Sequence, residues 1–261
     1  MLAMSTNEDF DDRDYDEPSK YRDFEKIEPS ELFTALGKLV FLESDPFLRM
    51  QAFNLGMTDQ FIMQMEYKVL QELWAEERTP ELAHFLNAQS QMWILSAYEL
   101  LRTWRESIKD ILNLHRNGGL PNKIASLKAQ ELADSNIGVV SRVEQLEEVV
   151  ANPQLVDVMK AHLDHTYMSF TMLEFLRVNL AKNTTRKKPN LIPMLPHGRI
   201  NKECGSLDFQ LAVGINILGE MNRRDVADSI RGLDLSAPVP SDEDQKSFEA
   251  WIRGPGQLPS F

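Results

Sequence analysis

The stretch TPELAHFLNAQSQMWILSAYELLRTWRESIKDILNLHRNGGLP, residues 79–121, decides the fold. It opens with Thr79-Pro80-Glu81, which offers a cap, a proline for the first helical position and an acid near the positive end of the helix dipole. No other breaker occurs before Gly118-Gly119, so the stretch predicts one helix of about 37 residues, roughly 55 Å long. Apolar residues recur along it at helical spacing, and a stripe of that length must be covered by other long helices.

Helical patterns on both sides of this stretch supply the covering helices. Ser30 caps a predicted helix, and Thr58 is a candidate cap for a second helix that ends near residue 77. Residues 122–150 carry a further apolar pattern with Gly138 as a bend, and Asn152-Pro153 starts a helix that runs to about residue 182. Short connections between long helices favour antiparallel packing, so we expect a helical bundle over residues 30–184.

The rest of the chain divides into three parts. Residues 1–31 hold eleven acids and four cations, which predicts a disordered or loosely attached acidic tail over residues 1–29. Residues 185–235 are expected to form a basic loop, a β-hairpin and a helix capped by Asn222, packed on the bundle. Residues 236–261 form an acidic, proline-rich tail whose Phe248 and Trp251 are candidates for docking on the bundle.

Together these patterns predict the fold class. The expected fold is mainly α, an antiparallel bundle of long helices with a small C-terminal β-hairpin and a terminal helix.

Composition narrows the classes of function. A formal net charge of −12 argues against nonspecific coating of DNA, because surfaces that coat DNA are strongly basic. The single cysteine, Cys204, excludes an internal disulfide and a cysteine-based zinc site and fits a reducing compartment. No secretory signal is apparent, and the most apolar run, MWILSAYELL, is too short to span a bilayer. We therefore expect a cytoplasmic protein that does not contact a membrane.

Sequence motifs for catalysis are weak in this chain. It contains no GxxxxGK[ST], GxGxxG or GxSxG pattern. Glu81 and His84 share one helical face and His162 and His165 share another, but a carboxylate metal site in a bundle needs a second Glu-x-x-His unit, which is absent. We therefore expect no catalytic residue, no metal site and no cofactor, with the histidines hydrogen-bonded near the edge of the core.

An enzyme is kept as the alternative function. In a helical-bundle nuclease or phosphoryl-processing enzyme acting on RNA or a nucleotide, Arg186, Lys187 and Arg199 would hold phosphate. His84 or His197 would then act as the general acid or base.

Positive charge gathers in residues 177–202, which contain seven cations and no acid. Cations at a helix C-terminus complement the dipole, but this group extends beyond the predicted helix end. We therefore predict an anion-binding site, which Arg223 and Arg224 join if the hairpin brings them close. The predicted site residues are Lys182, Arg186, Lys187, Lys188, Arg199, Lys202, Arg223 and Arg224.

The leading hypothesis is a non-enzymatic cytoplasmic interaction or regulatory protein. It would use the bundle surface and the basic segment to bind an acidic protein or anionic ligand, and the acidic tail of the same chain is a candidate partner. Nucleic acid is a weaker alternative because residues 177–202 contain no aromatic side chain on which bases could stack. The sequence is also compatible with a homo-oligomer.

Overall fold

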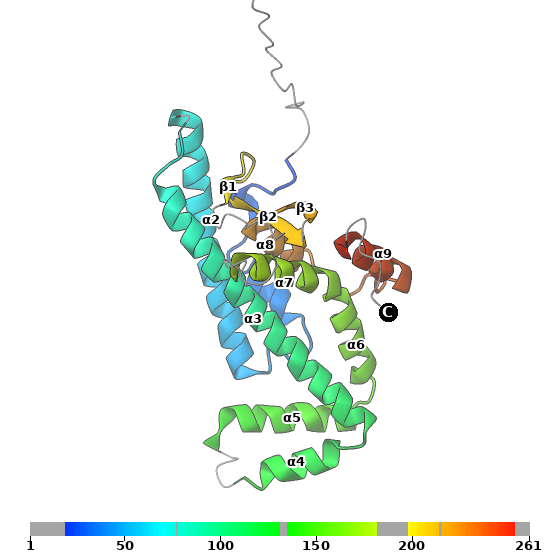
Figure 1. The fold of residues 1–261 in the computed structure, drawn as a ribbon. Coiled ribbons are helices and arrows are strands. Elements are labelled where there is room, and N and C mark those ends of the chain that lie inside the picture. The colour runs from blue at the N-terminus through cyan, green and yellow to red at the C-terminus, as the bar shows by residue number, and fades with distance from the viewer. Residues whose placement is uncertain (1–18, 77, 131–134, 182–197, 214–215, 254–261) are drawn as a thin grey trace, which may run out of the picture.

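The computed structural model describes residues 19–76, 78–130, 135–181, 198–213 and 216–253 (Figure 1). The fold is mainly α with a small antiparallel sheet near the C-terminus, which confirms the predicted fold class. In chain order the described elements are η1 (Phe24–Lys26), α1 (Glu31–Gly37), α2 (Pro46–Glu76), α3 (Leu82–Arg116), α4 (Leu120–Lys128), α5 (Ile137–Ala151), α6 (Leu155–His165), α7 (Tyr167–Ala181), β1 (Arg199–Ile200), β2 (Leu207–Val213), β3 (Asn216–Met221), α8 (Arg223–Arg231) and α9 (Asp242–Arg253).

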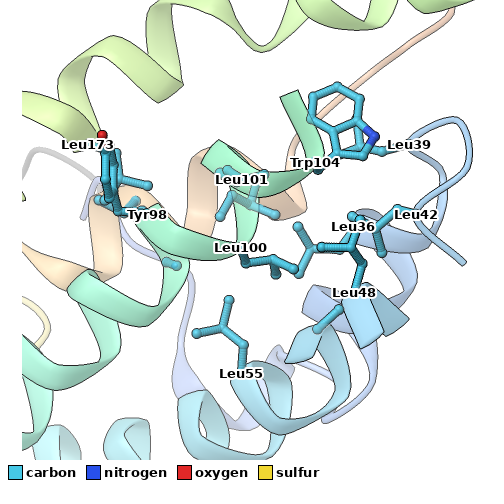
Figure 2. Close-up of a cluster of buried hydrophobic side chains, with 14 of the residues drawn as sticks. Leu36, Leu39, Leu42, Leu48, Leu55, Tyr98, Leu100, Leu101, Trp104 and Leu173 are labelled. Atoms are coloured by element: carbon cyan, nitrogen blue, oxygen red, sulfur yellow. The ribbon is translucent and has the colours of Figure 1, made fainter. Parts of the chain in front are cut away.

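The long helix predicted from residues 79–121 is present as α3, which has 35 residues and packs against α2. Leucines of α1, of α2 and of the segment between them share the buried core with Leu100 and Trp104 of α3 (Figure 2). Both core tryptophans also donate hydrogen bonds to backbone carbonyls, from Trp93 to Leu55 at 3.1 Å and from Trp104 to Val40 at 2.9 Å. These bonds satisfy the indole N–H groups that burial removes from water.

The expected start of the second helix is wrong. Thr58 lies inside α2, where its hydroxyl donates to the carbonyl oxygen of Asn54 at 2.8 Å. The helix begins twelve residues earlier, at Pro46, and the carboxylate of Asp45 accepts hydrogen bonds from the backbone N–H groups of Phe47 and Leu48. Asp45 therefore performs the capping role that we assigned to Thr58.

Two of the other predicted helices are divided. Residues 122–150 form α4 and α5, which pack on each other at one end of the molecule, and the side chain of Asn136 caps α5 (Figure 1). Residues 152–182 are interrupted at Thr166, where the direction of the chain changes between α6 and α7 (Figure 1). The Thr166 hydroxyl accepts a hydrogen bond from buried Arg105, so a tertiary contact is made at the interruption.

The predicted hairpin is part of a three-stranded antiparallel sheet of order β1-β2-β3. The helix that follows is the predicted one: Asn222 and Asp225 form a capping box at its start, and Gly232 is its C-cap. The sheet and α8 pack against α7, and α8 also contacts α1 and α3 (Figure 1). None of the described helices combines the length and the apolar composition of a membrane-spanning segment.

Both terminal segments contribute ordered contacts. Residues 19–29 are not a loose tail, because Tyr21 and Ile27 are buried and η1 lies within the segment. At the other end, α9 carries Phe248 edge-on against Tyr167 of α7, with ring centroids 6.3 Å apart. The proposed docking of Phe248 is confirmed, whereas Trp251 stacks on Phe248 and stays about half exposed.

Candidate functional site

The predicted basic site is only partly within the described residues. Lys182, Arg186, Lys187 and Lys188 lie outside them. Arg199 is on β1, an edge strand, and Lys202 is in the turn that leads to β2. Both side chains are exposed, and neither forms an ion pair with another described residue.

Arg223 does not belong to an exposed anion-binding site, so its assignment to that site was wrong. Its side chain is fully buried beneath the N-terminal end of α8. The guanidinium donates to both carboxylate oxygens of Glu66, from Nε at 2.9 Å and from Nη2 at 2.6 Å, and donates from Nη1 to Asp59. It also lies over the ring of Trp93, 5.3 Å from the centroid. These bonds are charge-assisted and the side chain has no exposed surface, so an external ligand cannot reach the guanidinium.

The electrostatic state of this cluster follows from its geometry. Burial alone lowers the pKa of Arg223, but the negative charges of Glu66 and Asp59 outweigh burial and raise it above its ordinary value. A second buried arginine, Arg231, pairs with the other oxygen of Asp59 and with Asp228. The cluster therefore holds charged arginines and balances them with carboxylates inside the protein.

Arg224 is also a structural residue and not part of an exposed site. Its side chain is buried, its Nε donates to Asp228 at 3.1 Å, and its Nη2 donates to the carbonyl oxygen of Arg22 at 2.6 Å. The second bond joins α8 to the segment that precedes α1. Two adjacent cations at the start of α8 are unfavourable for the helix dipole, and the bonds of Arg223 and Arg224 to carboxylates and to a backbone carbonyl offset that cost.

The N-terminal segment docks between α8 and the turn that follows β1. The hydroxyl of Tyr21 donates to Asp225 at 3.1 Å and accepts from the side-chain amide of Asn222 at 2.8 Å. The carboxylate of Glu203 accepts from the Ser19 hydroxyl and from the backbone N–H of Lys20, both at 3.1 Å. The first described residues of the chain therefore lie against the turn that carries Lys202.

An open pocket of about 240 Å³ lies between this segment and α8. Each cation at its wall already has a carboxylate partner: Lys20 pairs with Asp225 at 2.6 Å, and Arg22 pairs with Glu31 at 2.5 Å. The pocket therefore offers an outside anion no unpaired charge from the described residues. The residues that line it are Lys20, Arg22, Glu31, Asp228, Arg231 and Gly232.

The histidines that we considered do not form a common site. His84 is exposed at the start of α3, whereas His162 and His165 are on α6, beside the other end of α3 (Figure 1). His162 accepts a hydrogen bond at Nδ1 from the backbone N–H of Val40 at 3.0 Å, as expected for a histidine at the edge of the core. Among the described residues no group of three or more His, Cys, Asp or Glu side chains is placed to hold a metal ion. His197 lies outside the described residues.

Cys204 is placed for packing and not for nucleophilic chemistry. Burial, together with the charge of Glu66, raises the pKa of its thiol to about 12. A thiol with that pKa carries almost no thiolate near neutral pH.

Comparison of the chain with models of protein families, with curated proteins and with solved structures found no match.

The main residues that sequence reasoning missed are Asp59 and Glu66. They are seven residues apart, which places them on one face of α2, and that face is otherwise apolar. Two acids on the buried face of a helix require buried cations. The sequence signal for those buried cations was the pair of adjacent arginines at the start of α8, because cations at that position are unfavourable for the helix dipole.

Proposed function

We propose that this chain is a cytoplasmic, non-enzymatic interaction or regulatory protein that binds an acidic protein through its basic segment, residues 177–202, and the adjoining bundle surface. One observation carries the proposal: the segment has seven cations and no acid in a chain of net charge −12. Of its described cations, Arg199 and Lys202 are exposed without a described carboxylate partner, unlike Arg223, Arg224 and Arg231. The other described cation of the segment, Arg177, is half-buried on α7 and lies over the ring of Tyr98. Exposed cations of this kind attract an acidic partner and set its rate of association.

An acidic protein is a better candidate than a nucleic acid. The segment lacks aromatic side chains for base stacking, and the overall negative charge of the chain repels a polyanion that approaches from any other side. A partner with a short acidic stretch needs only the local basic surface.

The N-terminal residues provide a means of regulation. Residues 1–18 contain seven acids and one cation, and Ser19, which follows them, is hydrogen-bonded to Glu203 in the turn beside Lys202. Attachment at that place gives the acidic residues a high effective concentration near the basic segment. They would therefore compete with an external acidic partner.

A binding experiment tests both parts of this proposal. A fluorescein-labelled polyglutamate peptide is titrated with the full chain and with a chain lacking residues 1–18, at about 50 mM and about 300 mM NaCl. We expect the shortened chain to bind several-fold more tightly, and higher salt to weaken both interactions. Deletion stops at residue 18 because residues 19–29 pack on the body of the protein.

Charge-reversal variants localise the binding. Arg199→Glu with Lys202→Glu is expected to weaken peptide binding, whereas the control, Lys109→Glu with Lys123→Glu, reverses two exposed cations on α3 and α4. Absence of binding by the shortened chain, or an equal loss in both double variants, would contradict the proposal.

A further inference from the structure

Helix α2 has a second apolar face opposite the one that it buries. Helix α2 contacts α1, α3, α5 and η1, whereas five large apolar side chains between residues 47 and 61 are 48% to 60% exposed. Their spacing of three or four residues places them on one side of the helix. These five residues define the α2 outer face: Phe47, Met50, Phe53, Met57 and Phe61.

Between its two exposed cations, Arg49 and Lys68, the exposed surface of α2 carries no charge. Between Met50 and Tyr67 the charged residues are Asp59 and Glu66, and both are buried against Arg223. The exposed polar residues of that span are amides, Gln51, Asn54 and Gln64. In a chain in which 26% of the residues are charged, such a surface has the composition of an interface core: aromatic residues and methionine without charge.

We propose that the α2 outer face packs against the same face of a second copy of this chain, about a two-fold axis. A symmetric interface of this kind must be complementary to itself, and a charged patch would repel its own copy. An uncharged apolar face meets that requirement, and amide side chains pair with one another because each has a donor and an acceptor. It also allows two chains of net charge −12 to meet at a surface that adds no charge repulsion.

The exposed apolar area is more than half of what one partner buries in a stable dimer. Five Phe and Met side chains, each about half exposed, present on the order of 500 Å² of apolar surface per chain. The largest apolar patch on a typical monomer is roughly 300–600 Å², and a stable interface buries roughly 800 Å² per partner. The flanking amides supply the polar rim that brings the buried area toward that value.

The sequence of the face fixes the register of the pair. Phe53 and Phe61 lie four residues on either side of Met57. When two α2 helices cross antiparallel with the two-fold axis at Met57, each Phe53 meets the partner's Phe61. Met57 then lies beside its own copy.

A membrane surface is a poorer occupant for the same face. Helices that lie in a membrane interface have a polar face rich in lysine and arginine. Helix α2 has two cations in its 31 residues, Arg49 and Lys68, and its other face is buried in the core.

Sedimentation of the full chain tests the proposal. At about 50 µM we expect a dimer of 30.0 kDa chains, and Met57→Glu should convert it to a monomer because two carboxylates would meet on the axis. Val158→Glu, which changes an exposed apolar residue on α6, should leave the dimer intact. Near-ultraviolet circular dichroism of the buried Trp93 and Trp104 checks that each variant is folded.

A cross-linking experiment tests the register. Met57→Cys places two thiols beside the axis, and oxidation with copper phenanthroline should give a disulfide-linked dimer, since Cα atoms closer than about 7 Å can be bridged. The unsubstituted chain, which has only Cys204, should give none. A monomer at this concentration, or a Met57→Glu chain that stays dimeric, overturns the proposal. So does a monomer that co-sediments with phosphatidylcholine vesicles, which would assign the face to a membrane.

Discussion

Replacing Arg223 by methionine is the most informative perturbation of this fold. The substitution keeps a long, flexible side chain in the space under Trp93 and removes the positive charge that Glu66 and Asp59 share. Asp59 keeps its bond to Arg231, but Glu66 loses both of its charge-assisted hydrogen bonds and stays fully buried. The variant therefore isolates the cost of one unpaired buried carboxylate.

The size of the effect follows from that burial. Breaking a buried ion pair by removing one partner costs about 3–5 kcal/mol, because the remaining charge has neither solvent nor a counter-ion. A domain is stable by about 5–15 kcal/mol, so Arg223→Met should remove a large share of the stability. We expect a fall in melting temperature on the order of 10 °C.

A double-mutant cycle measured by urea unfolding separates charge from packing. Glu66→Met alone should cost a similar amount, since it leaves Arg223 with Asp59 as its sole carboxylate partner. The double variant, Arg223→Met with Glu66→Met, leaves the Asp59–Arg231 pair balanced and should be far more stable than the sum of the single losses predicts.

Two results would refute this reasoning. One is a loss of unfolding free energy below about 1 kcal/mol for Arg223→Met, because that is the contribution of an exposed ion pair and not of a buried one. The other is additivity of the two single variants, which would mean that the side chains contribute through packing alone.

Three further predictions concern other buried positions of the fold. Gly205 has φ +74°, and in Gly205→Ala the added Cβ would lie 2.0 Å from the carbonyl oxygen of Glu66, so urea unfolding should show a free energy of unfolding lower by about 3 kcal/mol or more. Gly118 has φ +71° but open space around it, so the control Gly118→Ala should lower the free energy of unfolding by only about 1 kcal/mol. Iodoacetamide at about pH 8 should alkylate Cys204 at least a hundredfold faster in urea than in the folded protein, because burial raises its thiol pKa to about 12. Burial lowers the pKa of His162, so the unfolded state binds a proton more readily than the folded state, and stability falls as pH drops below about 6.5. His162→Gln should therefore reduce the loss of unfolding free energy measured between about pH 7 and about pH 5.

The parts of the fold that were predictable have local causes. The length of α3 follows from an uninterrupted apolar period, and the start of α8 follows from Asn222, whose side chain caps the helix as expected. These signals lie within a few residues of the structure that they specify. Sequence patterns therefore identified the elements that nearby residues determine.

The parts that were not predictable depend on distant residues. Arg223 meets Asp59 and Glu66 across 164 and 157 positions of the chain, and no local period records that meeting. The helical stretch that contains α6 and α7 is interrupted at Thr166, although neither proline nor glycine is present there. Thr166 accepts a hydrogen bond from Arg105, which lies 61 positions earlier in the chain. For the same reason, the adjacent arginines of α8 resembled exposed cations in the sequence although the fold buries them.

Helix α2 links the buried cluster to the two proposed surfaces. Asp59 and Glu66 face inward, where they bind arginines of α8, and the phenylalanines of α2 face outward. The β1–β2 turn approaches the inward side closely enough that Gly205 touches the backbone of Glu66. Lys202, in that turn, is therefore on the side of α2 opposite the outer face. Dimerisation through an uncharged face should then be insensitive to salt, whereas polyglutamate binding at Arg199 and Lys202 should weaken with salt in monomer and dimer alike.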